Sequence, residues 1–253
     1  MNFFFGVKNN ILSSEIAIPR FQNKSNIKSS YNLYGAFVEN NKWNIILLNN
    51  CAVNKEFFLV KNQIIDNKKI FFLATDKEIK KFINTKLINL NNFTDTIPEY
   101  RANLRVYLKN GGFSSYQSEY PYDMIPKNGS LLSSVFSLTN MNANKNYLLI
   151  RNIFVDPIEE NFPVYFVDIK LNKIIEQTVV KTNHTNQIEI NKLLINPEIF
   201  VVSKKYLGIP IYISEKNKHL SIEHTHPPHE YILGHNKYEK VKQLKDKINE
   251  IIN

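Results

Sequence analysis

The sequence predicts a mainly β protein: a β-sandwich or jelly-roll-like core, a smaller N-terminal β-rich unit and a C-terminal amphipathic helix. Short apolar and aromatic segments recur along the chain, and turn-forming residues separate them. Only the last residues carry a long helical pattern. We therefore expect an N-terminal β-rich unit with a short helix over 1–95, a β-sandwich or jelly-roll domain over 100–235, and a helix over 236–253 that packs on this domain.

Four strands are expected in the N-terminal unit. Their connectors at 39–42 and 66–69 contain Asn and Asp, which tolerate tight-turn backbone geometry. Thr75 and Glu78 then form a capping-box pattern, which predicts a short helix after the fourth strand. The expected strands are 33–38, 43–48, 56–60 and 70–74.

The second half continues the β pattern after a connector at 89–98. Leu104, Val106 and Leu108 alternate with polar or amphipathic neighbours, as in a strand with one buried face. The segment 164–169 is apolar on both faces apart from Asp168, which predicts a central strand between packed layers. The expected strands are 104–108, 132–138, 147–154, 164–169, 174–180, 187–190, 200–204 and 209–213.

The chain ends in a predicted helix over 237–252. Asn236 is a suitable N-cap, and Glu239 occupies the reciprocal capping-box position. Apolar residues recur with helical spacing, and this stripe favours packing against the helix's own domain over docking a partner or a membrane. The stripe consists of Tyr238, Val241, Leu244, Ile248 and Ile251.

The charge balance is basic, with a formal net charge of +9 and a pI near 9.3. Arginine, whose planar fork suits phosphate and base recognition, occurs only at Arg20, Arg101, Arg105 and Arg151. The lysines are spread along the chain, and the densest groups contain acidic neighbours. This pattern favours a solvated lysine-rich surface over a dedicated nucleic-acid face.

Other features narrow the class of protein further. No apolar run reaches the roughly 18 residues of a membrane span, and the start does not have the pattern of a secretory signal. Cys51 is the one cysteine, so a disulfide framework is excluded, and we expect a cytoplasmic protein. The chain has seven glycines and neither a Walker loop nor a Gly-X-Gly-X-X-Gly motif, which argues against nucleotide binding.

The most distinctive segment is a histidine cluster near the C-terminal helix. Five of the six histidines lie between His219 and His235. In an extended strand, Leu220, Ile222, His224 and His226 point to one face, and the two apolar residues indicate that this face is the core side. The two imidazoles are then roughly 6.5–7 Å apart along the strand.

This spacing suits a metal ion, because metal–nitrogen bonds of about 2.0–2.1 Å let both rings reach one ion. His224 and His226 are the predicted metal ligands, with zinc, iron, manganese or nickel as candidates that the sequence does not distinguish. His229 or Glu230 is available as a third ligand, and Glu223 as a carboxylate that orients a ring. The alternative is that these histidines bond to backbone, stack on tyrosines or remain exposed.

The stretch from His224 to Glu230 is similar to the first metal box of the cupin family, in which His-X-His is followed by glutamate. The resemblance implies a metal bound at the mouth of a jelly roll. The sequence departs from the family pattern at Lys218, where the family has glycine, and at Gly234, which follows Glu230 too soon. A second histidine box does not follow, so we do not assign the chain to this family.

A second candidate binding segment is the glycine-led stretch 111–124, expected to form a loop rich in tyrosine. Aromatic rings stack on the apolar face of a sugar, while amides and carboxylates bind its hydroxyls. The alternative is that these aromatic side chains pack together as a small core. The predicted ligand-binding residues are Tyr116, Gln117, Glu119, Tyr122 and Asp123.

Taken together, these features predict a soluble ligand-binding protein with a histidine-cluster site, supported by a metal or not, for a carbohydrate-like or other polar small ligand. The alternative is a metal-dependent or histidine-based enzyme in which Glu230 or Glu223 acts as base and His229 takes part in catalysis. A further alternative is an assembly protein that docks a partner through its C-terminal helix. The sequence specifies neither the ligand nor the oligomeric state.

Overall fold

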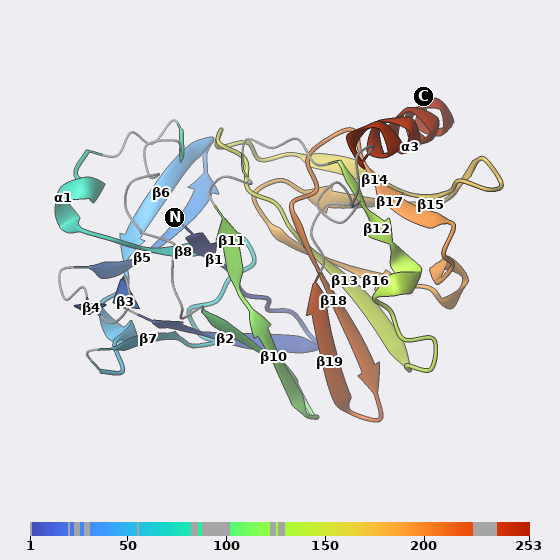
Figure 1. Ribbon diagram of the computed structural model, residues 1–253. Helices are drawn as coiled ribbons and strands as arrows, with labels where there is room; N and C mark the ends of the chain where they lie inside the picture. The colour runs from blue at the N-terminus through green and yellow to red at the C-terminus, as the bar shows by residue number, and fades with distance from the viewer. Residues whose placement is uncertain are drawn as a thin grey trace. The chain divides into compact units, whose positions relative to one another are not determined.

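The protein is mainly β, with four antiparallel sheets and a C-terminal helix in the part of the chain that the structure describes, and this confirms the predicted fold class (Figure 1). The structure is a computed structural model. The described residues are 2–19, 21–22, 26–27, 31–54, 56–81, 86–87, 102–121, 125, 130–224 and 237–253.

The chain forms two compact units. The first comprises 1–126 together with the short segments 153–159 and 182–185, and the second comprises 127–152, 160–181 and 186–253. Residues 102–121, which the sequence analysis placed with the 100–235 domain, therefore group with the first unit. The reason is strand pairing, since this stretch forms hydrogen-bonded ladders with strands from the beginning of the chain.

The first unit contains two antiparallel sheets, in the strand orders β11-β1-β8-β5-β6 and β10-β9-β2-β7. A two-stranded ribbon, β3 (Phe21–Gln22) and β4 (Asn26–Ile27), also forms in this unit. The strands of the two sheets are β1 (Asn2–Phe4), β2 (Leu12–Pro19), β5 (Asn32–Glu39), β6 (Lys42–Leu47), β7 (Phe57–Val60), β8 (Ile70–Ala74), β9 (Asn103–Leu108), β10 (Phe113–Gln117) and β11 (Glu119–Pro121).

Local sequence explains how these strands begin and end. Asn40 and Asn41 both have positive φ, of 54° and 55°, so they form the tight turn predicted between β5 and β6. The helix α1 (Asp76–Ile79) begins with the predicted capping box: the Thr75 hydroxyl accepts from the Glu78 N–H, and the Glu78 carboxylate accepts from the Thr75 N–H.

Two buried serines hold the N-terminal segment against the sheets. The Ser14 hydroxyl accepts from the Val7 N–H and donates to the Val7 carbonyl, at 2.9 and 2.8 Å. The Ser118 hydroxyl makes the equivalent pair of bonds with Phe5, at 2.9 and 2.5 Å. Gly6 lies between these two residues, where a Cβ atom would be 2.7 Å from Ser14 Oγ. Side-chain hydroxyls thus replace strand ladder bonds along this segment.

The second unit contains two four-stranded antiparallel sheets, in the orders β12-β17-β14-β15 and β16-β13-β18-β19. β14 is an inner strand with few exposed residues, as predicted for 164–169. The strands are β12 (Leu131–Ser134), β13 (Lys145–Arg151), β14 (Asn161–Asp168), β15 (Lys173–Lys181), β16 (Thr185–Ile190), β17 (Ile199–Val202), β18 (Ile209–Lys216) and β19 (His219–His224).

The helix α3 (Lys237–Ile252) packs on the β12-β17-β14-β15 sheet. Its Ile248 and Ile252 are buried together with Val167 of β14 and Val202 of β17. Leu244 and Ile251 of the predicted stripe lie at the margin of the same cluster. No described helix has the length and apolar character that a membrane span requires.

Two segments differ from the expectations. The predicted strand 132–138 ends at Ser134, and a 3-10 helix, η4 (Val135–Ser137), follows because the Ser134 hydroxyl accepts from the Phe136 N–H. The stretch 111–124 is not a loop where it is described. It forms β10 and β11, because Phe113–Gln117 pairs with β9 and Glu119–Pro121 pairs with β1.

Candidate functional site: an aromatic face of the first unit

The outer face of the β10-β9-β2-β7 sheet carries the candidate site. Strand alternation buries Leu104 and Val106 of β9 and turns the residues between them outward. The register then aligns outward residues of β2, β9 and β10 in three rows. The rows are Ser13, Tyr107 and Phe113; Glu15, Arg105 and Ser115; and Ala17, Asn103 and Gln117.

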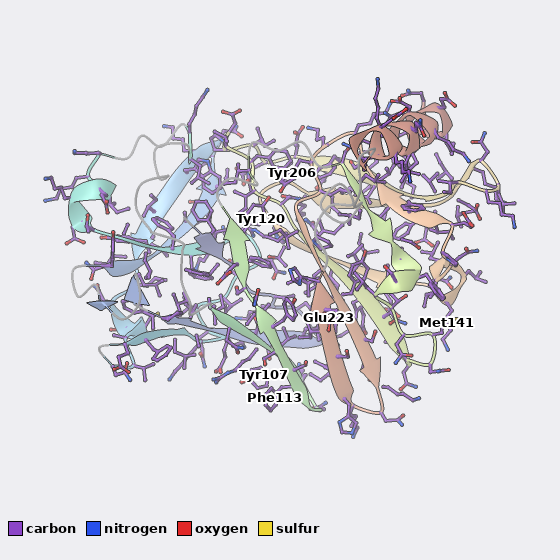
Figure 2. The ribbon with its side chains drawn as sticks, in the orientation of Figure 1. Tyr107, Phe113, Tyr120, Met141, Tyr206 and Glu223 are labelled. Atoms are coloured by element: carbon purple, nitrogen blue, oxygen red, sulfur yellow. The ribbon has the colours of Figure 1, made fainter. Side chains whose placement is uncertain are left out.

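Two aromatic rings lie side by side at one end of this surface. The ring centroids of Tyr107 and Phe113 are 5.5 Å apart and their planes are inclined by 33° (Figure 2). Phe113 is 61% exposed, an unusually large exposure for a phenylalanine. The pair therefore presents apolar ring surface to solvent rather than to a core.

Charged groups flank the rings. The Tyr107 hydroxyl donates to Glu15 Oε2 at 3.2 Å. Burial, followed by the charge of Glu15 and this hydrogen bond, raises the pKa of Tyr107, and Arg105 opposes the rise. The phenol is therefore neutral at physiological pH and acts as a donor. Glu15 and Arg105 are cross-strand neighbours, which places an acceptor and a donor next to the rings.

We call this surface the aromatic face. It combines two ring surfaces with amide, hydroxyl, carboxylate and guanidinium groups on one face of a sheet. Its residues are Glu15, Asn103, Arg105, Tyr107, Phe113, Ser115 and Gln117.

The predicted ligand-binding residues are separated by the fold. Gln117 lies on the aromatic face and is exposed. Tyr116 lies on the opposite side of β10, in register with the buried Leu104. Glu119 belongs to β11 in the other sheet, where its Oε1 accepts from the Ala102 N–H at 3.2 Å. Tyr122 and Asp123 lie outside the described residues.

The predicted histidine strand is present as β19. Its register with β18 places His224 beside Ile211, and Ile222 beside Ile213, on one face of the sheet. Ile222 is buried and His224 is partly buried, as the inward orientation predicted. Glu223 is exposed and lies on the opposite face, so it is not placed to orient the His224 ring.

The predicted metal site remains a prediction. His226, His229 and Glu230 lie outside the described residues. Within the described part of the chain, no three His, Cys, Asp or Glu side chains converge on a point where they could hold an ion. Cys51, predicted to be a structural thiol, is buried, and burial raises its pKa.

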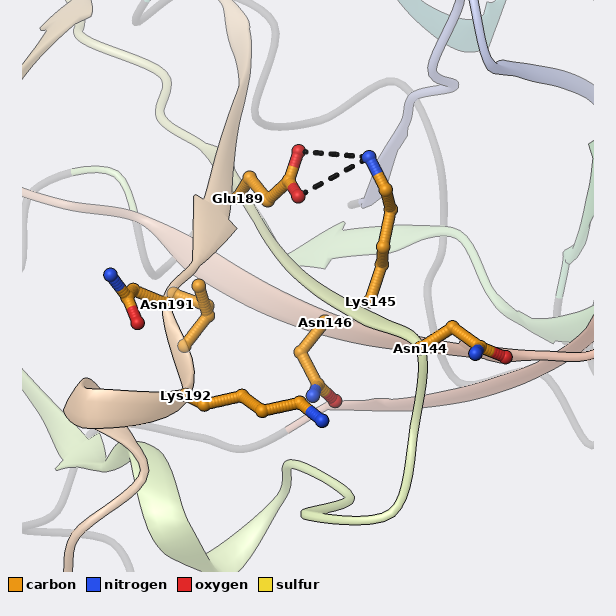
Figure 3. Close-up of a pocket in the computed structure, with 7 residues that line it drawn as sticks. Asn144, Lys145, Asn146, Glu189, Asn191 and Lys192 are labelled. Carbon is orange, nitrogen blue, oxygen red and sulfur yellow. Dashed lines mark hydrogen bonds and ion pairs between the residues drawn. The ribbon is translucent and has the colours of Figure 1, made fainter.

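The second unit contains a separate hollow of about 390 Å³ between β13 and the segment that follows β16 (Figure 3). Its apolar wall is Ile190, and the remaining lining is polar. Lys145 Nζ bonds both carboxylate oxygens of Glu189, at 3.3 and 3.5 Å. We call it the polar hollow; its polar residues are Asn144, Lys145, Asn146, Glu189, Asn191 and Lys192.

The sequence did not point to Tyr107, Arg105 and Glu15 as candidate site residues. The signal was present in the alternation of Phe113, Ser115 and Gln117 with Ser114 and Tyr116, which is a strand pattern. The glycines at 111–112 made the stretch look like a loop, although they only complete the β9–β10 hairpin, where the Leu108 N–H donates to the Gly112 carbonyl. The residues of β2 and β9 that lie beside Phe113, Ser115 and Gln117 are set by strand register, which the sequence does not show.

Comparisons of the chain with protein-family models, with curated proteins and with solved structures gave no significant match.

Proposed function

We propose that this protein binds carbohydrate through the aromatic face of its first unit. The observation that carries the proposal is the exposed pair of Tyr107 and Phe113, with Glu15 and Arg105 in the adjacent row. The ligand class is the one that the sequence suggested, whereas the location differs from the histidine segment.

The rings supply the apolar part of such recognition. A sugar ring has one face of C–H groups, and these pack on an aromatic ring without losing hydrogen bonds to water. Two neighbouring rings 5.5 Å apart offer this contact to a single pyranose or to two adjoining residues of a chain. Exposed aromatic area of this kind has no role in the core of the first unit.

The polar residues of the aromatic face supply the hydrogen bonds of the proposed sugar recognition. Arg105 donates, Glu15 accepts, and the amides of Asn103 and Gln117 do both. Vicinal hydroxyl groups need donors and acceptors in close alternation, and the rows of the sheet provide this alternation at strand spacing. An anion would be repelled by Glu15, and a cation by Arg105, so the balance favours a neutral polyhydroxylated ligand.

The openness of the aromatic face favours binding over turnover. The aromatic face is an open strand surface, and hydrolysis of a glycosidic bond requires a pair of carboxyl groups on either side of that bond. Its one carboxylate, Glu15, already accepts from Tyr107. The expected ligand is therefore an extended glycan that lies along the sheet, rather than a small molecule enclosed in a cavity.

Affinity electrophoresis of the full chain through gels that contain soluble polysaccharides tests the proposal. A panel of neutral glucans, mannans and galactans is compared with a gel that contains no polysaccharide. We expect at least one polysaccharide to retard the wild-type protein, and Phe113→Ala to remove most of that retardation.

The matched control is Phe136→Ala, which removes an exposed aromatic ring, 44% accessible, from η4 in the second unit. It should migrate like the wild type. Gln117→Ala should weaken retardation less than Phe113→Ala, because it removes hydrogen bonds but no ring surface. Equal retardation of wild type and Phe113→Ala, or no retardation by any polysaccharide, contradicts the proposal.

A further inference from the structure

The lining of the polar hollow in the second unit offers more hydrogen-bond donors than acceptors to a ligand. Its volume of about 390 Å³ is within the range of small-molecule sites. The hollow is built from residues of the second unit alone, so it is independent of the aromatic face. Which ligand it suits depends on which polar atoms the protein has already used.

Backbone contacts fix the orientation of two amides in the lining. Asn144 Oδ1 accepts from the Asn217 N–H at 2.8 Å, and Asn191 Oδ1 accepts from the Leu193 N–H at 3.1 Å. A backbone N–H only donates, so the oxygen of each side chain must face it. The Nδ2 groups therefore remain as donors, and neither has a hydrogen-bond partner among the described residues.

The third amide, that of Asn146, is hydrogen-bonded to the protein through both its oxygen and its nitrogen. Asn146 Oδ1 accepts from the Ser214 hydroxyl and from the Asn140 N–H, at 2.6 and 3.1 Å. Its Nδ2 donates to the Asn140 carbonyl at 3.0 Å. Asn146 is 2% exposed, so it forms a fixed wall rather than a ligand contact.

The two lysines of the lining, Lys145 and Lys192, add positive charge on exposed side chains. Lys192 is exposed and makes no ion pair within the described ranges. Lys145 is paired with Glu189, and their side chains are 45% and 55% exposed. Exposed ion pairs of this kind contribute little stability, so an incoming anion replaces Glu189 at the Lys145 ammonium at small cost. The hydrogen bond that the Lys145 ammonium donates to Glu189 raises the pKa of Lys145, which therefore stays charged.

We infer that the polar hollow binds a small anion through a carboxylate or phosphate group. The Nδ2 groups of Asn144 and Asn191 and the ammonium groups of Lys192 and Lys145 are donors, whereas Glu189 is the one lining carboxylate. Anionic oxygens accept several hydrogen bonds at once and complement such a set. A neutral sugar would leave part of it unused.

Titrations of the full-length protein, followed in ¹H–¹⁵N NMR spectra, test this inference. Inorganic phosphate and citrate are the two probes, and sodium chloride is used to hold the ionic strength constant. We expect the side-chain amide signals of Asn144 and Asn191 to shift and saturate with at least one probe. Saturation with phosphate alone or with citrate alone identifies the anion class; an absence of saturation with both overturns the inference.

Three variants make the test specific. Asn144→Asp and Asn191→Asp retain the oxygen that accepts from the backbone N–H and replace the donor by a second carboxylate oxygen. Each should abolish saturable binding while the fold is retained. Lys192→Gln removes one charge and should weaken binding by about tenfold, or 1.4 kcal/mol.

The control is Lys173→Gln on β15, which removes another exposed lysine of the same unit from the other sheet. It should bind like the wild type. If Lys173→Gln weakens binding as much as Lys192→Gln does, the response reflects the general positive charge of the protein, and the inference is wrong. Full-strength binding by both Asp variants would also overturn it.

Discussion

The two units differ in the kind of contact that stabilises each of them internally. In the first, the hydroxyls of Ser14 and Ser118 hold the segment 5–7 by pairs of buried hydrogen bonds. In the second, α3 packs against one face of a sheet through an apolar stripe that includes Ile248 and Ile252. The stability of the buried hydrogen bonds depends on each donor keeping its acceptor. The stability of the apolar stripe depends on how completely its side chains fill the space against the sheet.

The comparison extends to the two candidate sites. The aromatic face uses ring surface with a balanced set of donors and acceptors, whereas the polar hollow has no ring and an excess of donors. The two proposals thus assign two different ligand chemistries to the antiparallel sheets of one chain. The outward residues of a strand provide the first, and the strand ends and their connections provide the second.

The largest expected effect on stability is that of Ile248→Ala. Ile248 is completely buried against the β12-β17-β14-β15 sheet, so truncation leaves a cavity. We expect a loss of about 3 kcal/mol in the free energy of unfolding, measured by urea denaturation. Lys247→Ala, at an exposed neighbouring position, is the control and should leave the free energy nearly unchanged. Equal effects would mean that the stripe does not hold the helix.

Ser14→Ala should cost somewhat less, about 2 kcal/mol, because it leaves the N–H and the carbonyl of Val7 buried without their partner. Ser13→Ala, which changes the adjacent outward position, serves as the control in the same denaturation experiment. A cost below that of the control would contradict the directional role of the buried serine.

Tyr34→Phe tests a polar contact that responds to pH. The Tyr34 hydroxyl donates to Asp76 Oδ1 at 2.5 Å, and burial, together with this carboxylate, raises the pKa of Tyr34 to about 12. The folded state therefore holds the phenol proton more tightly than the unfolded chain, whose tyrosine pKa is about 10.

The contribution of Tyr34 is fully present below pH 10 and is lost as the pH rises from about 10 to about 12. We expect Tyr34→Phe to cost about 1 kcal/mol at neutral pH and to weaken the alkaline decline. Thermal melting at pH values from about 7 to about 11 measures both. An unchanged alkaline decline in the variant would contradict the assignment.

The smallest effect is expected for Lys145→Gln. Its ion pair with Glu189 is solvent-exposed, and such pairs are screened by water and salt. Denaturation should detect no change in stability, while anion binding in the polar hollow should weaken. A clear loss of stability would show that this pair is structural.

Much of the fold could be predicted from the sequence because the relevant signals are local. The Asn40–Asn41 turn, the Thr75–Glu78 capping box and the α3 stripe each depend on residues close together in the chain. Most strands of the second unit were also expected within a few residues of their ends.

The missed features depend on partners distant in sequence. β2 was not expected, because the polar residue Ser14 interrupts its buried row of Leu12, Ile16 and Ile18. The burial of Ser14 is explained by its hydrogen bonds to the backbone of Val7, which the sequence pattern does not show. The aromatic face likewise requires the register that brings β2, β9 and β10 together. The composition of the 111–124 segment predicted a ligand-binding role, but it did not show which of its side chains face outward.

The central claim is that the aromatic face binds carbohydrate, and its most direct test is an NMR titration of the intact protein with a soluble oligosaccharide. The oligosaccharide is derived from the polysaccharide that retards the protein most. We predict saturable shifts of the ring signals of Tyr107 and Phe113 and of the side-chain amide of Gln117, with no change at Phe136. Shifts confined to residues outside the aromatic face, or none at all, would contradict the account.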